Sequence, residues 1–186
     1  MADLTNRDAW KILAEETIFD AMPFVGLSRQ TVEVSDGRII KDYYQVQLSD
    51  FAIACAVTED GEVITLWQYK HGARRYGLTF PAGMIEPGED PMLAMRRELL
   101  EETGYEAGEG ETLGRYVVSG NQGCGAAHVF LFRNCRKVSV ADAGDLEAMD
   151  LRLMTVAEVG AAVADGSTAI LSHLAVWALA GPKLRR

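Results

Sequence analysis

The stretch GMIEPGEDPMLAMRRELLEETGY, residues 83–105, decides what kind of fold this chain can form. Gly and Pro punctuate its first part, whereas PMLAMRRELLEET has the composition of an α-helix. Asp90 fits the N-cap position, Pro91 fits the first helical position, and Gly104 is a natural stop. We therefore predict a loop followed by one well-bounded helix.

Three glutamates lie on one face of this predicted helix. Glu98, Glu101 and Glu102 are spaced i, i+3 and i+4, so their carboxylates repel one another and weaken the helix. A bound cation would relieve the repulsion, and hard oxygen ligands at this spacing suit Mg²⁺ or Mn²⁺. A solvated acidic stripe with Arg96 and Arg97 as ion-pair partners fits the pattern equally well. The helix alone leaves both interpretations open.

The rest of the chain predicts strands mixed with a few helices. Strand pairs are predicted around turns at residues 35–37 and 59–61, and the nearly all-apolar FAIACAV is predicted to be a buried strand. Residues 7–22 fit a short helix or an irregular arm. The other predicted elements are strands near 112–119, 127–133 and 148–154, and helices over 155–164 and 168–180. Without regular βαβ alternation, this order indicates an α+β fold or an α/β sandwich.

Length and composition indicate a globular protein with a substantial core. The chain has 186 residues, of which 48% are hydrophobic and 24% are charged. No apolar run is long enough for a membrane span and the N-terminus does not resemble a signal peptide, so we expect a cytoplasmic protein without a membrane partner. A net charge of −9 disfavours nucleic-acid binding. Cys55, Cys124 and Cys135 are irregularly spaced, which predicts reduced thiols and no zinc site.

The opening stretch resembles the Nudix box. That family's pattern is Gly, five residues, Glu, seven residues, and then Arg-Glu-aliphatic-any-Glu-Glu-any-Gly-aliphatic. Every charged and glycine position is matched here, and the one departure is Tyr105 at the final aliphatic position. The resemblance implies an α/β fold, the Nudix α/β/α sandwich with a mixed β-sheet. It also implies a pyrophosphatase, a hydrolase that cleaves a diphosphate linkage with Mg²⁺ as cofactor and Mn²⁺ as a substitute.

The resemblance implies a metal site at matching positions of this sequence. Glu98 and Glu102 look like the principal metal ligands, and Glu101 looks like a further ligand or a partner of one. The backbone carbonyl of Ala82, just before the box glycine, often completes the metal site in relatives. All four residues are therefore our candidate metal-binding set.

Three more box residues receive roles from the same resemblance. Arg97 and Glu89 resemble the pair that braces the loop against the helix, which would orient the metal ligands. We include Arg97 in the catalytic set for this reason. Gly83, the box glycine, is a candidate substrate-binding residue.

Sequence outside the box resembles the ADP-ribose and ADP-sugar pyrophosphatase branch of the family. Gln68-Tyr69-Lys70 resembles the branch's Gln-Tyr-Arg, and LTFPAGMIEPGE resembles its Glu-Leu-Pro-Ala-Gly approach to the box. This implies ADP-ribose or an ADP-sugar as substrate, with AMP and a sugar phosphate as products. Lys70 would contact the diphosphate, although a solvated surface lysine explains it equally well. The branch also implies an N-terminal arm and β-strand pair over 1–47 that forms a homodimer, followed by the hydrolase domain over 48–186.

A late loop often supplies the catalytic base in that branch. The matching stretch here is GDLEAMDLRLMTVAEV, in which Glu147 is our candidate base and Asp145 the second choice. Both also fit ordinary exposed loop acids. Two departures concern the substrate: residues 118–125 lack the branch's proline, and Thr79 replaces its usual acid. Alternatives are therefore a GDP-sugar, a dinucleoside polyphosphate or NADH as substrate, or a non-catalytic nucleotide-binding regulatory module.

Overall fold

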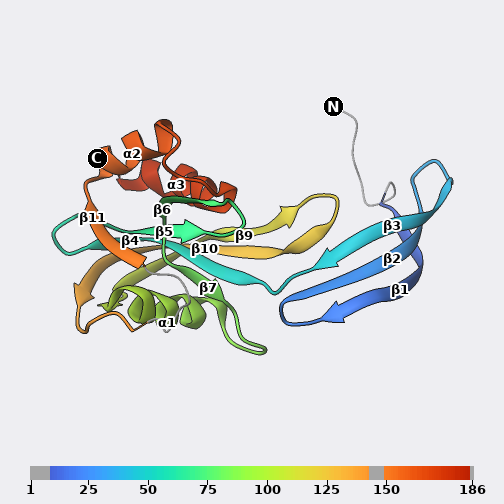
Figure 1. Ribbon diagram of the computed structural model, residues 1–186, viewed down its shortest axis with the longest axis horizontal. Helices are drawn as coiled ribbons and strands as arrows, with labels where there is room; N and C mark the ends of the chain where they lie inside the picture. Colours follow the sequence, from blue (N-terminus) through green and yellow to red (C-terminus); the bar gives the residue numbers. More distant parts are fainter. Residues whose placement is uncertain (1–8, 143–148, 185–186) are drawn as a thin grey trace. The chain divides into compact units, whose positions relative to one another are not determined.

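A computed structural model describes residues 9–142 and 149–184 of the chain (Figure 1). These residues form two compact units. The first unit contains the described residues up to Ser49 together with Val117–Ala126, and the second contains the others. Among the described residues, no helix combines the length and the apolar character that a membrane crossing requires.

Three antiparallel strands form most of the first unit. β1 (Lys11–Ala21) pairs with β2 (Val25–Glu33), and β2 pairs with β3 (Ile39–Gln47). The predicted strand pair is confirmed as β2 and β3. Gly37 lies between them with a φ of 83°, a left-handed conformation that glycine adopts without steric cost.

The interpretation of residues 7–22 as a helix or an irregular arm is wrong over Lys11–Ala21, which form β1. In the single chain this strand is exposed at every position except the last. Because neither face of β1 is buried within the chain, its sequence lacks the alternation that identifies a half-buried strand.

The second unit contains most of the remaining elements. The central strands are β4 (Phe51–Thr58), β5 (Val63–Lys70), β11 (Met149–Met154) and the part of β10 (Gly123–Lys137) from Ala127 onward. The shorter or peripheral strands are β6 (Arg75–Thr79), β7 (Ala82–Met84), β8 (Tyr105–Glu106) and the part of β9 (Glu109–Ser119) up to Tyr116. The helices are α1 (Pro91–Thr103), α2 (Val156–Ala164) and α3 (Leu171–Leu184). The predicted helices and late strands are thus confirmed, but β7 includes Gly83, where the Gly and Pro residues predict only a loop.

A mixed sheet lies between two helical layers in the second unit. β4 runs parallel to β10 and antiparallel to β5, and β5 is antiparallel to β11. Figure 1 shows α1 on one face of this sheet and α2 and α3 on the other. The architecture is the α/β/α sandwich that the resemblance implies.

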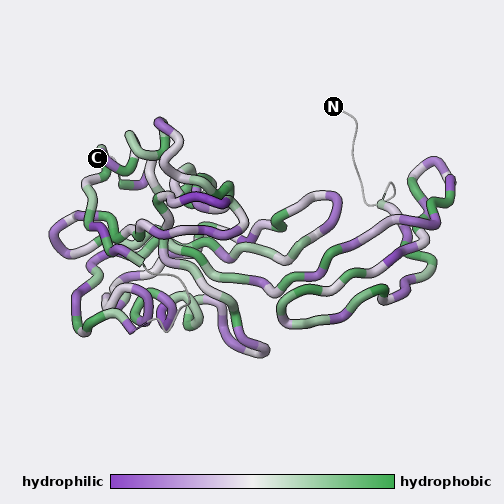
Figure 2. The backbone as a smooth tube through the Cα atoms, in the orientation of Figure 1, coloured by the Kyte–Doolittle hydropathy of each residue, from purple (hydrophilic) through white to green (hydrophobic). Residues whose placement is uncertain are grey.

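β4 lies at the centre of both cores. Its residues Ala52, Ala54 and Ala56 pack in one cluster with Ala94 and Leu99 of α1. The alternate residues of β4 pack in a second cluster with α2 and α3: Ile53, Cys55 and Val57. Both faces of the strand are therefore buried, as its apolar sequence predicts, and Figure 2 shows the hydrophobic colour along the middle strands.

The ends of α1 follow the sequence prediction. The Asp90 side chain accepts hydrogen bonds from the backbone N–H groups of Met92 and Leu93, at 2.9 and 3.1 Å. Gly104 adopts a left-handed conformation with a φ of 70°, and its N–H donates to the Leu100 carbonyl. Both ends of the helix are thus fixed by the residues that the sequence identified.

Candidate active site

Helix α1 holds the three box glutamates in different environments. Glu102 is buried, the Glu98 side chain is 15% exposed and the Glu101 side chain is 47% exposed. The acidic face therefore runs from a buried end to solvent, unlike a stripe that is solvated throughout. A stripe that bound only solvent would not require the burial of Glu98 and Glu102.

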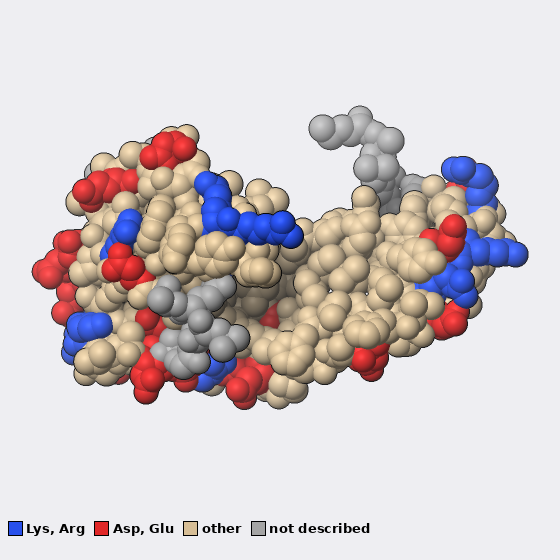
Figure 3. All heavy atoms as spheres, in the orientation of Figure 1, with Lys and Arg blue, Asp and Glu red and all other residues tan. Residues whose placement is uncertain are grey.

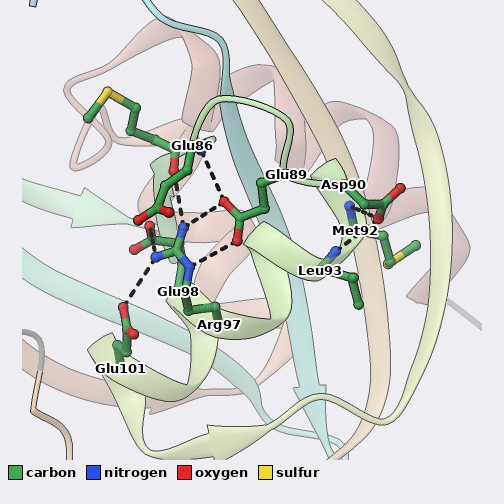
Figure 4. A network of polar contacts seen from close by, with 9 residues as sticks. Glu86, Glu89, Asp90, Met92, Leu93, Arg97, Glu98 and Glu101 are labelled. Atoms are coloured by element: carbon green, nitrogen blue, oxygen red, sulfur yellow. Dashed lines mark hydrogen bonds and ion pairs between the residues drawn. The ribbon is translucent and has the colours of Figure 1, made fainter. Parts of the chain in front are cut away.

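Arg97 connects the box loop to this acidic face (Figure 4). Its Nε and Nη2 donate to the two carboxylate oxygens of Glu89, each at 3.0 Å. Its Nη1 donates to Glu98 at 2.7 Å and to Glu101 at 3.3 Å, and its Nη2 also donates to the Met84 carbonyl at 3.2 Å. One guanidinium thus fixes the loop, the helix and the direction of two box carboxylates.

Arg97 and its carboxylate partners stabilise one another in their charged forms. The hydrogen bonds from Arg97, followed by the backbone N–H of Glu86, lower the pKa of Glu89. The carboxylates of Glu89 and Glu98 raise the pKa of Arg97. Arg97 and Glu89 are therefore both ionised at neutral pH, and their ion pair connects the loop to the helix.

The Ala82 backbone faces the buried end of the glutamate row. Ala82 N–H donates to Glu102 Oε2 at 3.0 Å, while the preceding Pro81 carbonyl accepts from the Ala54 N–H at 3.1 Å. In an extended strand, the N–H and C=O of one residue point to the same side. The Ala82 carbonyl therefore points away from β4, on the side of Glu102.

Gly83 lies directly against Glu98. A Cβ atom at Gly83 would lie 1.9 Å from Glu98 Cδ and 2.2 Å from each carboxylate oxygen. Only glycine leaves space for the Glu98 carboxylate at this point. The backbone of β7 and the Glu98 side chain of α1 are therefore in close contact at this point.

The donor atoms fit a hard divalent cation. Within residues 9–142 and 149–184, no three acidic, histidine or cysteine side chains are arranged as a metal-binding group. Instead, Arg97 engages Glu98 and Glu101, and Ala82 N–H engages Glu102. Mg²⁺, however, is commonly bound by only one or two carboxylates together with waters and substrate phosphates. The buried Glu102 and the partly buried Glu98 are compatible with that coordination, and so is the Ala82 carbonyl on the side of Glu102.

Lys70 lies at the end of β5, in a separate pocket. This open pocket has a volume of about 560 Å³, and its lining includes Lys70, His71 and Ile170 but no described residue of α1. The lining is mostly apolar, with Lys70 and His71 as its titratable side chains. Contact between Lys70 and a substrate stays a prediction.

Glu147 and Asp145, the candidate bases, lie outside the described residues. The three cysteines are free thiols, as predicted, and Cys55 and Cys135 are buried. Burial raises the pKa of the Cys55 thiol to about 12, so it cannot act as a thiolate nucleophile at neutral pH.

Comparison with known proteins gives the family of this chain. Residues 49–173 match the family model of the NUDIX domain. The chain belongs to the Nudix family. This membership, and the retention of every box glutamate, identify it as a Nudix pyrophosphatase, a hydrolase.

Relatives of this Nudix hydrolase carry more than one name. A methanol dehydrogenase activator of Bacillus methanolicus is 29% identical over 154 residues, which are 80% of this chain and 82% of that protein. An ADP-ribose pyrophosphatase of Bacillus subtilis (strain 168) is 32% identical over 121 residues, 65% of this chain and 64% of that protein. The crystal structure of an ADP compounds hydrolase has the same fold, with a TM-score of 0.80 at 19% identity over 95% of this chain and 94% of that one.

Sequence reasoning missed one buried polar residue beside the Nudix box. His173 accepts a hydrogen bond from the backbone N–H of Phe80, two residues before Ala82. A single histidine in the apolar helix LSHLAVWALA gives no sequence signal of that contact. Only the tertiary structure brings α3 to the approach of the box.

Proposed function

We propose that this Nudix hydrolase cleaves the diphosphate linkage of ADP-ribose or an ADP-sugar, giving AMP and a sugar phosphate, with Mg²⁺ as cofactor and Mn²⁺ as a substitute. The observation that carries the proposal is the convergence of Glu98 and Glu102 with the Ala82–Gly83 backbone. The similarity to a protein named ADP-ribose pyrophosphatase supports this choice of substrate.

The residues around the proposed metal site have distinct tasks. Glu98 and Glu102 would hold the metal together with the Ala82 carbonyl, and Glu101 would serve as a further ligand or as a partner of one. When bound, Mg²⁺ neutralises charge on phosphate oxygens and orients an attacking water. Arg97 keeps the carboxylates directed towards the box loop, so that little reorganisation is needed when substrate binds.

Replacement of Glu102 tests the ligand assignment. Glu102→Gln should lower kcat by about a hundredfold or more, the effect typical of removing one preorganised charge-stabilising group. The fold should stay intact, because the amide oxygen of Gln can still accept the Ala82 N–H. Steady-state kinetics and thermal unfolding would measure both effects, with Glu109→Gln, an exposed acid on β9, as the control. Near-normal turnover of Glu102→Gln would contradict the assignment.

Glu147 is our proposed general base, with Asp145 as the second choice. The proposal rests on the position of the stretch GDLEAMDLRLMTVAEV after the box. Glu147→Gln should lower kcat with little effect on the Mg²⁺ concentration that gives half-maximal activity, because a base acts on the attacking water. An unchanged kcat in Glu147→Gln together with a loss in Asp145→Asn would move the role to Asp145.

A different diphosphate is the second candidate substrate, and Thr79 favours it. Thr79 stands where the ADP-ribose branch usually has an acid, and its fully buried hydroxyl accepts from Gln68 Nε2 at 2.7 Å. The position therefore presents no carboxylate to a ligand. The substrates that remain open are a GDP-sugar, a dinucleoside polyphosphate and NADH. A nucleotide-binding module without turnover is disfavoured, because the box keeps all of its glutamates.

A hydrolysis screen with Mg²⁺ separates these candidates. ADP-ribose, ADP-glucose, GDP-mannose, NADH and diadenosine polyphosphates would be compared, with products identified by mass. AMP and ribose 5-phosphate as the fastest-forming products would support the ADP-ribose assignment. Faster cleavage of another compound would assign that substrate, and binding without cleavage would favour the regulatory module.

We also infer a homodimer formed through the first unit. Strand β1 and the turn that follows it expose several large apolar side chains in the single chain: Ile12, Leu13, Ile18, Phe19, Met22 and Phe24. Figure 3 shows a broad uncharged area on this unit. Large exposed apolar patches typically mark protein–protein interfaces, and we infer that these side chains take part in one.

A further inference from the structure

His173 is a buried polar residue of α3 with a defined partner. Only 6% of its surface is exposed, and its Nδ1 lies 2.9 Å from the backbone nitrogen of Phe80, whose N–H it accepts. Because Nδ1 is the acceptor, the ring proton of the neutral imidazole is on Nε2. The buried ring is therefore held in one tautomer by the main chain of another element.

Phe80 is held by α3 in two further ways. Its ring stacks on the His173 ring with centroids 6.3 Å apart, and on the Trp177 ring with centroids 6.2 Å apart. His173 and Trp177 are four residues apart on α3, so both project from the same face of the helix. One helix therefore fixes both the side chain and the backbone N–H of Phe80.

The Phe80 N–H needs this contact because of where it lies. Phe80 is 1% exposed and stands between the end of β6 and the start of β7, outside both strands. A buried backbone N–H without a partner is costly, and water does not reach this position. The His173 imidazole accepts the hydrogen bond that a carbonyl of a neighbouring strand would accept if Phe80 lay within the sheet.

The next two residues connect this contact to the box. The Pro81 carbonyl accepts from Ala54 of β4, and the Ala82 N–H donates to Glu102 of α1. Three successive residues are thus fixed by α3, by the sheet and by α1. Helix α3, on the opposite face of the sheet from α1, thus contacts the residue that immediately precedes Pro81 and Ala82.

We propose that His173 is a positioning residue, which acts through Phe80 to hold the Ala82 carbonyl and the Glu102 carboxylate in the arrangement that binds the metal. The inference rests on the metal site of the proposed function. Burial, and secondarily the charge of Lys70, lower the pKa of His173 to about 3, so the acceptor stays available at neutral pH. His173 does not touch the metal or the substrate in this proposal.

The test measures metal affinity directly, without turnover. His173→Leu has a similar volume but no acceptor, whereas His173→Asn places a carbonyl oxygen near the position of Nδ1. Mn²⁺ binding to each full-length variant would be followed by electron paramagnetic resonance, together with kcat, KM and thermal unfolding. Val176→Ala, a core truncation elsewhere on α3, is the control for general destabilisation.

We expect His173→Leu to bind Mn²⁺ about 10- to 100-fold more weakly, the usual effect of losing a residue that orients a metal ligand. Its kcat should fall, its KM should change little, and His173→Asn should recover most of the Mn²⁺ affinity. Val176→Ala should lower the unfolding temperature and leave Mn²⁺ affinity unchanged. If His173→Leu does not fold, His173→Phe keeps the ring stacking without the acceptor and takes its place.

The possible failures are distinguishable. Wild-type Mn²⁺ affinity in His173→Leu, with a loss in Glu102→Gln, would overturn the positioning role and leave the metal site standing. Equal losses in His173→Leu and His173→Asn would overturn the role of the acceptor. Equal Mn²⁺ binding by wild type and Glu102→Gln would overturn the metal site itself, and the positioning role with it.

Discussion

At Gly83, a hydrogen atom stands where any other residue would place a carbon against Glu98. Such a carbon would lie 1.9 Å from Glu98 Cδ, far below van der Waals contact, so either the backbone or the carboxylate would have to move. Arg97 and the register of β7 on β4 hold the loop in place. At the scale of the residue, a small side chain here is a requirement of the glutamate site.

Gly83→Ala should therefore displace the Glu98 carboxylate and lower both Mn²⁺ affinity and kcat, each by about 10- to 100-fold. Kinetics and Mn²⁺ titration would measure the effect. Gly120→Ala is the matched control, because a Cβ atom there meets nothing within 4 Å. Equal activity of the two variants would show that the close approach has no role in catalysis.

Helices α1 and α3 contribute to the site in different ways. α1 supplies charged groups whose spacing is visible in the sequence, and its ends are fixed by Asp90 and Gly104. α3 supplies one neutral acceptor, His173, and packs on Phe80. At the scale of the element, one helix carries the proposed metal ligands and the other supports the segment that faces them.

The buried imidazole of α3 predicts how stability depends on pH. Burial lowers the pKa of His173 from 6.5 to about 3, so the unfolded chain binds more protons than the folded chain between these values. Stability must then decrease as pH falls below about 6.5, by ~2 kcal/mol between about pH 7.5 and about pH 5. Urea unfolding at both pH values should show this loss in wild type and in Val176→Ala.

His173→Leu lacks the titrating group, so its stability should fall less between the same two pH values. The difference from wild type isolates His173, because all other titrating residues are unchanged. An identical loss in wild type and His173→Leu would mean that the imidazole becomes protonated in the folded protein.

The two compact units differ in how much of their surface is buried within the chain. The second unit contains both hydrophobic cores and the glutamate site, and it does not need the first unit to bury α1. The first unit is a thin sheet whose strand β1 is exposed in the single chain. At the scale of the whole molecule, that exposure is the physical reason to expect a second copy of the chain.

Phe19→Glu should convert a dimer into a monomer, because a buried unpaired carboxylate in an apolar interface is strongly unfavourable. Phe19 lies on β1 and is 53% exposed in the single chain. Sedimentation velocity would measure the mass of wild type and variant. Val140→Glu, which changes an apolar residue of the second unit that is 86% exposed, should leave the mass unchanged. A wild-type monomer at micromolar concentration would contradict the dimer.

The sequence determined the parts of this protein that depend on local spacing. The i, i+3, i+4 pattern placed Glu98, Glu101 and Glu102 on one helical face, and the capping residues fixed where α1 begins and ends. Alternation and apolar runs identified β4 and β5, and the box pattern identified the family. Each of these features lies within a short stretch of the chain, so it can be predicted without knowledge of distant contacts.

The tertiary structure decided the features that join distant segments. β1 could not be predicted because it buries neither face within its own chain, and β6 and β7 are too short for a readable period. The contact of His173 with Phe80 spans 93 residues, and that of Ala82 with Glu102 joins a strand to a helix. Such contacts depend on how helices and sheet pack on one another, and single residues in an apolar helix carry no local pattern that reveals them.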